Sequence, residues 1–171
     1  MFKTLLALQI LFTAVPMLAR DKTIGLFTRE GNEIHLYDGT NWKQIGIVDG
    51  EPFDMISRGT ILYTREGDNL HAYSEGIWKK IGIVADTPFE MKPVGDTLFT
   101  REGKELHKYE NETWTEIGVV AEEPFEMFAF PSMLLTREGE DLHKYQNGTW
   151  SKIGVVGQSP FQMTPYVQFG R

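Results

Sequence analysis

Three kinds of side chain that can do chemistry recur in this sequence with one fixed spacing of 36 residues. An arginine can hold a carboxylate through a fork of hydrogen bonds, a tryptophan ring can stack on a sugar, and an imidazole can bind a metal ion. Because the same set occurs four times, it favours equivalent binding sites over one asymmetric catalytic centre. The recurring residues are Arg29, Arg65, Arg101 and Arg137, Trp42, Trp78, Trp114 and Trp150, and His35, His71, His107 and His143.

The arginines belong to a repeated Thr-Arg-Glu-Gly segment, first seen at residues 28–31. Neighbouring residues on a strand face opposite ways, so each arginine should find its partner outside its own Arg-Glu pair. A backbone carbonyl or a carboxylate of a neighbouring unit would serve. Two interpretations follow, a guanidinium that clamps adjacent units together and a guanidinium that binds a ligand at the rim of the assembly.

The tryptophans and histidines also allow a structural and a functional interpretation. Each tryptophan directly follows a turn, where it is either a packed anchor or an aromatic plate that stacks on a sugar. Each histidine is alone in its unit, and the sequence has no cysteine. Four imidazoles in four separate units should lie too far apart to share one ion. We therefore expect packed or hydrogen-bonded histidines, with no metal and no cofactor.

The sequence lacks the arrangements that are typical of catalysis. No serine lies in a Gly-x-Ser-x-Gly segment, and no cysteine is available as a nucleophile. The acid at Glu90 becomes Gln162 in the last unit, so a pair of carboxylates is not maintained. These observations predict a protein that is not an enzyme.

The 36-residue period itself predicts a repeat architecture, because no insertion or deletion interrupts it. Within one unit, short apolar and β-branched runs at 53–55, 60–64, 70–73 and 77–84 predict four strands separated by Gly, Asn and Ser turns. Four antiparallel strands per unit are typical of a propeller blade. We predict an all-β fold, a small β-propeller of four blades in one domain over residues 20–171. Its repeats are 28–63, 64–99, 100–135 and 136–171.

The two ends of the repeat array differ from the middle. The first unit lacks a Phe-x-Met strand ahead of residues 23–27, and the last unit is followed by an extra one at 161–163. That C-terminal strand would complete the first blade and close the ring, which would leave no bare sheet edge. A homodimer that shares an eight-bladed arrangement is the alternative.

The order of these motifs resembles the blade pattern of the tectonin-repeat family. The Trp-Lys-Gln-Ile-Gly segment at 42–46 and the Leu-His-Ala-Tyr segment at 70–73 match that pattern, whereas residues 62–65 replace its Trp-Gly pair. The resemblance implies a β-propeller and a lectin-like affinity for glycans. Tectonin rings usually have six blades, two more than the repeats counted in this chain.

The N-terminal residues and the charge predict where the protein works. Residues 1–19 have the pattern of a secretory signal peptide, with Lys3, an apolar stretch and a small residue at Ala19. The apolar stretch is too short for a membrane span, so we expect cleavage and a secreted, extracellular protein. Loss of Lys3 makes the formal charge of −7 more negative still. An acidic surface of this kind does not attract nucleic acid.

Two sequons mark equivalent turns in the third and fourth units. Asn111-Glu112-Thr113 and Asn147-Gly148-Thr149 lie 36 residues apart, where hairpin tips are expected. Both asparagines are therefore predicted N-glycosylation sites in a secreted chain.

Two functions remain, and they belong to different classes. The first is a multivalent lectin-like module whose repeated arginines and tryptophans bind glycans. The second is an extracellular structural protein, such as a component of a mineralised matrix or an egg coat, whose acidic surface suits cation contact. The expected partners are accordingly glycans or extracellular matrix.

Overall fold

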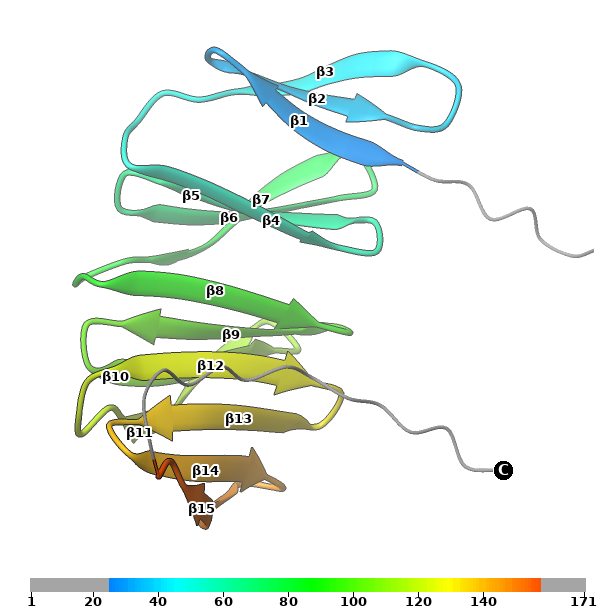
Figure 1. Cartoon of the computed structure of the whole chain (residues 1–171). Helices are drawn as coiled ribbons and strands as arrows, with labels where there is room; N and C mark the ends of the chain where they lie inside the picture. The colour runs from blue at the N-terminus through cyan, green and yellow to red at the C-terminus, as the bar shows by residue number, and fades with distance from the viewer. Residues whose placement is uncertain (1–24, 158–171) are drawn as a thin grey trace, which may run out of the picture.

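The computed structural model describes residues 25–157, and every regular element in that range is a β-strand. The strands form four antiparallel sheets, each a simple meander in which consecutive strands pair (Figure 1). We call each sheet a blade and number the blades in chain order. The four-stranded blades confirm the all-β propeller predicted from the sequence.

Blade 1 has three strands in the described range, and the other blades have four. Blade 1 contains β1 (Leu26–Glu30), β2 (Glu33–Tyr37) and β3 (Trp42–Ile47). Blade 2 contains β4 (Phe53–Arg58), β5 (Ile61–Glu66), β6 (Asn69–Ser74) and β7 (Ile77–Ile83). Blade 3 contains β8 (Phe89–Val94), β9 (Thr97–Glu102), β10 (Glu105–Glu110) and β11 (Thr113–Val119). Blade 4 contains β12 (Phe125–Phe130), β13 (Met133–Glu138), β14 (Asp141–Gln146) and β15 (Thr149–Val155).

The turns between strands follow from residues that tolerate a positive φ. The β14–β15 hairpin turns at Asn147 and Gly148, with φ of 51° and 77°. Two successive positive φ values define the tight turn that matches the twist of a hairpin, and Asn-Gly is its favoured pair. In a four-stranded blade, the turns after the first and third strands lie at one end, which we call the hairpin end. The turn after the second strand and the linkers between blades lie at the opposite, linker end.

A β-bulge interrupts the pairing of the last two strands in every blade. In blade 2, Leu70 lies opposite Gly82 and His71 lies opposite Lys80, so Ile81 has no partner in the register. The same shift occurs in the other three blades. An extra residue of this kind takes its backbone groups out of the ladder and leaves them available to other partners.

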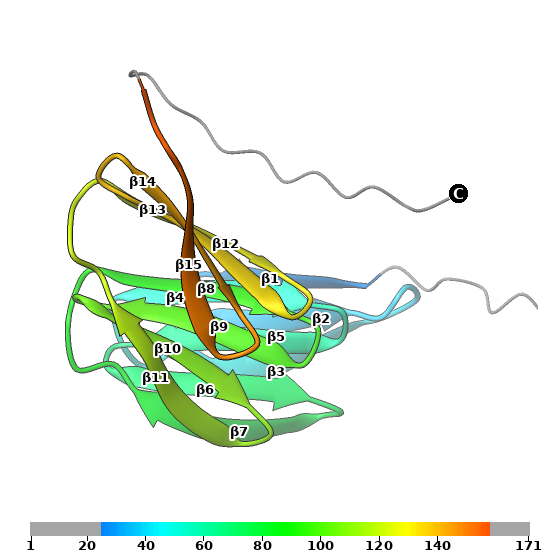
Figure 2. The same ribbon diagram turned by 90° about the horizontal axis from the view of Figure 1, so that it is seen from below.

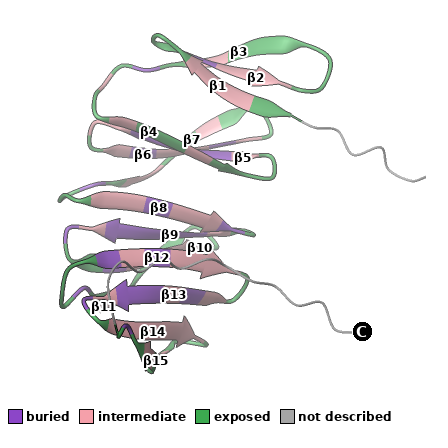
Figure 3. Cartoon of the chain, viewed as in Figure 1, coloured by how far each residue is buried: buried purple, intermediate pink, exposed green. Residues whose placement is uncertain are grey.

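The core lies between the blades. One buried cluster joins Tyr63, Leu70 and Val84 of blade 2 and its linker to Met91 and Leu98 of blade 3. Equivalent clusters join blades 1 and 2 and blades 3 and 4. Buried residues concentrate on the second strand of blades 2, 3 and 4 (Figure 3). Each blade is therefore stabilised by its neighbours, as in other repeat proteins.

Within residues 25–157, the blades follow one another along a stack. The first strands β4, β8 and β12 lie side by side in chain order. Blade 1 and blade 4 stand at opposite ends of the stack in Figure 1. Figure 2, seen from below, shows the blades overlapping along that direction with a change in strand orientation at blade 4.

Several sequence predictions fall outside the described residues. These are the signal peptide at 1–19 and the closing strand at 161–163, so the closure of the ring stays a prediction. The repeat limits 28–63, 64–99, 100–135 and 136–171 begin in the middle of a strand, so each repeat spans parts of two blades. In the part of the chain that the structure describes, no helix is long and apolar enough to cross a membrane.

Candidate functional site

The repeated arginines lie at the linker end, where each bonds to its own turn, and Arg29, Arg65 and Arg101 also contact the blade that follows. The Nε of Arg101 donates to the carbonyl of Gly103 at 2.9 Å, and its guanidinium lies 4.7 Å from the ring centroid of Phe125 in blade 4. It also pairs with Glu123 in the linker to blade 4. Arg29 and Arg65 repeat the turn bond and the stacking on Phe53 and Phe89.

The carboxylates that face these arginines are stabilised in their charged form. The hydrogen bond from Arg101 lowers the pKa of Glu123, and the hydrogen bond from Arg29 lowers the pKa of Glu51. Arg65 has Thr87 at the corresponding linker position. The arginine therefore serves first as a clamp between blades, and its ion pair is an addition that varies between copies.

The glutamate of the Thr-Arg-Glu-Gly segment holds the linker from the other side. Glu138 accepts a hydrogen bond from the backbone N–H of Ala121 at 3.1 Å, and Glu66 and Glu102 accept equivalent bonds from the linkers before their blades. The glycine N–H of the segment donates to the linker proline carbonyl, as from Gly139 to Pro124 at 2.9 Å. The segment thus has a structural task that explains why it recurs.

The tryptophans of blades 2, 3 and 4 seal the joint to the blade before. Each indole Nε1 donates to the carbonyl of a bulge residue in the preceding blade, and each ring covers the glycine next to that residue. Trp42 of blade 1 is 57% exposed and contacts Tyr37 of its own blade, with ring centroids 5.1 Å apart. The sealing bonds run from Trp78 to Ile45, from Trp114 to Ile81 and from Trp150 to Ile117, at 2.6, 2.6 and 2.5 Å.

The four histidines lie in four different blades. His107 packs edge-on against Trp114, and its Nε2 lies 3.5 Å from Glu105. The buried Nδ1 atoms of His107 and His143 have no hydrogen-bond partner among the residues that the structure describes. Among residues 25–157, no group of three or more His, Cys, Asp or Glu side chains could hold a metal ion.

Both predicted glycosylation sites lie at exposed hairpin tips. Asn111 is in the β10–β11 turn and Asn147 in the β14–β15 turn, both with positive φ. Glu112, inside the first sequon, pairs with Lys79 of blade 2 at 2.6 Å, and this hydrogen bond lowers the pKa of Glu112. Both asparagines are at the hairpin end, away from the arginines.

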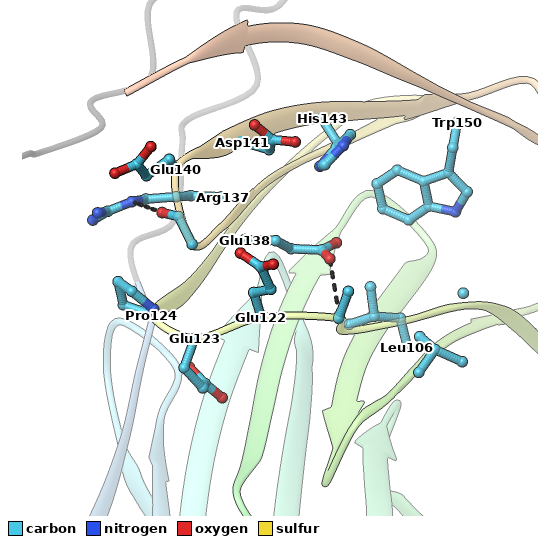
Figure 4. Close-up of a pocket in the computed structure, with 14 residues that line it drawn as sticks. Leu106, Glu122, Glu123, Pro124, Arg137, Glu138, Glu140, Asp141, His143 and Trp150 are labelled. Carbon is cyan, nitrogen blue, oxygen red and sulfur yellow. Dashed lines mark hydrogen bonds between the residues drawn. The ribbon is translucent and has the colours of Figure 1, made fainter. Parts of the chain in front are cut away.

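A cleft of about 940 Å³ opens between blades 3 and 4 at the linker end (Figure 4). Two of the predicted site residues, Arg137 and Trp150, line it together with His143. Figure 4 shows the carboxylates of Glu122 and Glu138 pointing into the space between the linker and the β13–β14 turn. The structure thus brings an arginine, an imidazole and an indole of the predicted set to one acidic cavity.

The cleft carries a strong negative charge. Glu122, Glu138, Glu140 and Asp141 line it, and Glu123 lies at its edge but turns to Arg101. Arg137, which is buried, donates from Nε to the carbonyl of Gly139 at 3.0 Å and pairs with Glu126 at 3.4 Å. The free space therefore suits a neutral or cationic ligand better than an anion.

The corresponding joint between blades 2 and 3 is much narrower. Its cavity measures about 180 Å³ and contains Glu102, His107 and Trp114. The acids that distinguish the larger cleft come from positions where the repeats differ. Glu140 corresponds to Lys104, and Glu123 corresponds to Thr87. The sequence-based prediction missed these acids because it relied on residues that recur in every repeat, whereas these acids stand at positions where the repeats differ.

The packing of the blades defines the class of protein. Consecutive four-stranded meanders packed face to face, each sealed to its neighbour through a recurrent tryptophan and arginine, make this chain a β-propeller protein. No family model and no curated protein matches the sequence.

Solved structures support the same fold. The N-terminal domain of Nup159 matches with a TM-score of 0.53 and 12% identity, covering 75% of this chain and 40% of that chain. A complex of S. cerevisiae Dbp5 bound to Nup159, Gle1, IP6 and ADP matches with a TM-score of 0.54 and 11% identity over the same shares. This chain therefore spans less than half of the structures it matches, and the likeness concerns the fold.

Proposed function

We propose that this protein is a secreted, non-enzymatic, lectin-like module that binds carbohydrate in the cleft between blades 3 and 4. The observation that carries the proposal is the combination of Trp150, His143 and several carboxylates around one open cavity. Carboxylates accept hydrogen bonds from sugar hydroxyls, and an indole offers an apolar face to the ring.

The charge of the cleft narrows the expected ligand. Carboxylates in the cavity outnumber Arg137 and the Lys152 that pairs with Asp141, so the cleft would repel sialylated or sulfated glycans, and neutral and amino sugars fit better. The cleft lies at the linker end, so a glycan on Asn147 at the hairpin end would not block it.

In this proposal the carbohydrate binds in the cleft and not at four equivalent tryptophans. The indoles of Trp78, Trp114 and Trp150 donate to the preceding blade, so removing one would disturb packing as well as any binding. Charge-neutralising substitutions in the cleft test binding without removing these packing contacts. Glu122 and Glu140 are exposed, and both line the cavity.

A glycan array with the purified chain tests the proposal. We expect binding to neutral or amino sugars, and we expect Glu122→Gln with Glu140→Gln to weaken it about tenfold, or about 1.4 kcal/mol. The matched control, Asp86→Asn with Asp68→Asn, changes the same repeat positions outside the cleft and should bind normally. Absence of binding to any glycan, with retention in an insoluble matrix fraction, would favour the extracellular structural protein.

A further inference from the structure

Blade 1 carries a tryptophan without the contact that its counterparts make. Trp78, Trp114 and Trp150 each donate to a bulge carbonyl of the blade before. No blade precedes blade 1 in the described residues, and Trp42 is more than half exposed. Blade 1 therefore presents an indole that is shaped for a blade-to-blade joint.

Blade 4 presents the complementary half of that joint. Its bulge leaves Ile153 out of the register, between Lys152 and Gly154, as the bulge of blade 3 does with Ile117. Ile117 is buried beside Trp150, whereas Ile153 is 53% exposed. Among the described residues, the only side chain within 4 Å of a Cβ placed on Gly154 is Leu142 of the same blade.

The first strand of blade 1 is uncovered in a second way. Leu26 of β1 is 53% exposed, and its counterpart Leu62 of β5 is 1% exposed. In blade 2, β4 pairs with β5 and covers it, but blade 1 has no equivalent of β4 in the described range. Met55 of β4 is 37% exposed, although its counterparts Met91 and Met127 are buried.

One segment of the chain has the residues to fill this edge. The strands β4, β8 and β12 begin Phe-Asp-Met, Phe-Glu-Met and Phe-Glu-Met, each after a proline. The segment Pro160-Phe161-Gln162-Met163 repeats that pattern after β15 at the same spacing. This segment follows blade 4 in the sequence as β8 follows blade 2. It is therefore linked to the same blade that presents Ile153.

We propose that blade 1 docks onto blade 4 of a second copy of this chain. Trp42 then donates to the carbonyl of Ile153 in that copy, and Phe161–Met163 of the same copy adds the missing first strand beside β1. A head-to-tail joint of this kind, formed twice between two copies, closes into one ring of eight blades. The closed ring leaves no sheet edge open.

The arrangement of the blades favours a second copy over closure within one chain. Blade 1 and blade 4 stand at opposite ends of the stack, so the two halves of the joint do not face each other in one molecule (Figure 1). The chain also matches only 40% of the Nup159 domain, as expected for an arc of a larger propeller. Two copies would carry two acidic clefts on one ring.

Disulfide trapping distinguishes the two copies directly, because the chain has no cysteine of its own. Met55 lies opposite Thr64 in blade 2, so the added strand would place Met163 opposite Thr28. Directly opposed residues of antiparallel strands are within disulfide distance. We expect the full chain with Thr28→Cys and Met163→Cys to form a covalent dimer on oxidation, and neither single variant to form it.

Two other results of this trapping would overturn the proposal. A disulfide within a chain of monomeric mass would show that the ring closes in one molecule. Thiols that stay free would show that another segment of the chain or a different partner covers β1.

Light scattering on the full chain provides a test that does not depend on the C-terminal segment. We expect the wild type at twice the mass of one chain, and Trp42→Ala and Gly154→Val at the mass of one chain with unchanged circular dichroism. Ile77→Ala, at an exposed site outside both faces, should remain dimeric. A wild type at the mass of one chain, or variants that remain dimeric, would contradict the proposed joint.

Discussion

At the scale of single residues, the repeated arginine is a structural group whose contribution to stability depends on how deeply it is buried. Arg101 is buried and holds a backbone carbonyl, an aromatic ring and a carboxylate together. Its partner Glu123 is mostly exposed. The two ends of one ion pair should therefore contribute unequally to stability.

Arg101→Ala should lower the free energy of unfolding by about 2–3 kcal/mol, because it removes charge-assisted hydrogen bonds from a buried site. Glu123→Gln should cost less than about 1 kcal/mol, because its carboxylate is largely in solvent. Urea denaturation of both variants and the wild type measures the difference. Equal losses for the two variants would contradict the assignment of the clamp to the arginine.

Acid should weaken the linkers between blades. The pKa values of Glu51 and Glu123 are lowered by their arginines in the folded state. Their contribution to stability is full above the unfolded pKa of about 4.3 and is lost as the pH falls through the lower folded pKa. Glu123→Gln should therefore flatten the loss of stability below about pH 4 in urea denaturation, and Lys43→Gln should not, since lysines do not titrate in that range.

At the scale of elements, the β-bulge turns a strand pair into a docking surface. The bulge takes the carbonyl of Ile117 out of the ladder, and Gly118 beside it lets the ring of Trp150 approach the backbone. The joint between blades depends on both features at once.

Gly118→Ala should lower the free energy of unfolding by about 1–3 kcal/mol, because a Cβ there would lie 3.0 Å from the Nε1 of Trp150. Gly157→Ala is the matched control, since nothing in residues 25–157 lies within 4 Å of a Cβ at that position. Thermal denaturation of the two variants measures the contrast. A neutral Gly118→Ala would mean that the indole is not held against the strand.

The hairpin tips are the elements on which glycans are expected. The turns at Asn111 and Asn147 are exposed and adopt positive φ, so both amides are accessible. In a glycosylating host, Asn111→Gln and Asn147→Gln should each remove one glycan from the secreted chain, as measured by intact mass. A mass that changes only by the added CH₂ group in each variant would show that the sequons are not used.

At the scale of the whole molecule, stability is shared because every core cluster joins two blades. Blades 2 and 3 each take part in two clusters, so no blade has a core of its own. Nearest-neighbour coupling of this strength favours one cooperative transition.

Leu98→Ala should cost about 2–5 kcal/mol and still unfold in a single step, because Leu98 is fully buried between two blades. Ile77→Ala, at an exposed site, should change stability by less than about 0.5 kcal/mol. Circular dichroism and tryptophan fluorescence should follow the same urea curve. Separate transitions for the two probes would contradict shared cores.

The sequence predicted the content of the blade well because that information is local. Alternating apolar residues, as in 70–73, and turn residues such as Asn147-Gly148 act on their own neighbours, and the period repeats them four times. In blade 2, the first three predicted strands were shorter than the observed ones by one to three residues, because pairing extends a strand beyond its apolar run, whereas the fourth prediction, 77–84, was one residue longer than β7.

The prediction of site residues was limited by contacts that the sequence does not reveal. Arg29 meets Glu51, and Trp78 meets Ile45, only after blades pack against each other. The bulge at Ile45 has no signature in the residues around it, although it decides where the indole bonds. The acidic cleft likewise depends on the wider joint between blades 3 and 4. Nearly identical repeats give no sign in the sequence that one joint is wider than another.

The amino-acid sequence by itself determined the repeat, the four-stranded unit and the turns, because these depend on interactions over a few residues. Tertiary structure alone decided which copies of a repeated residue are buried, which joint opens into a cleft and which faces stay uncovered. Trp42 and Trp114 occupy the same repeat position, yet Trp114 seals a joint and Trp42 faces solvent. Burial is a property of the neighbours of a residue, and only the fold supplies them.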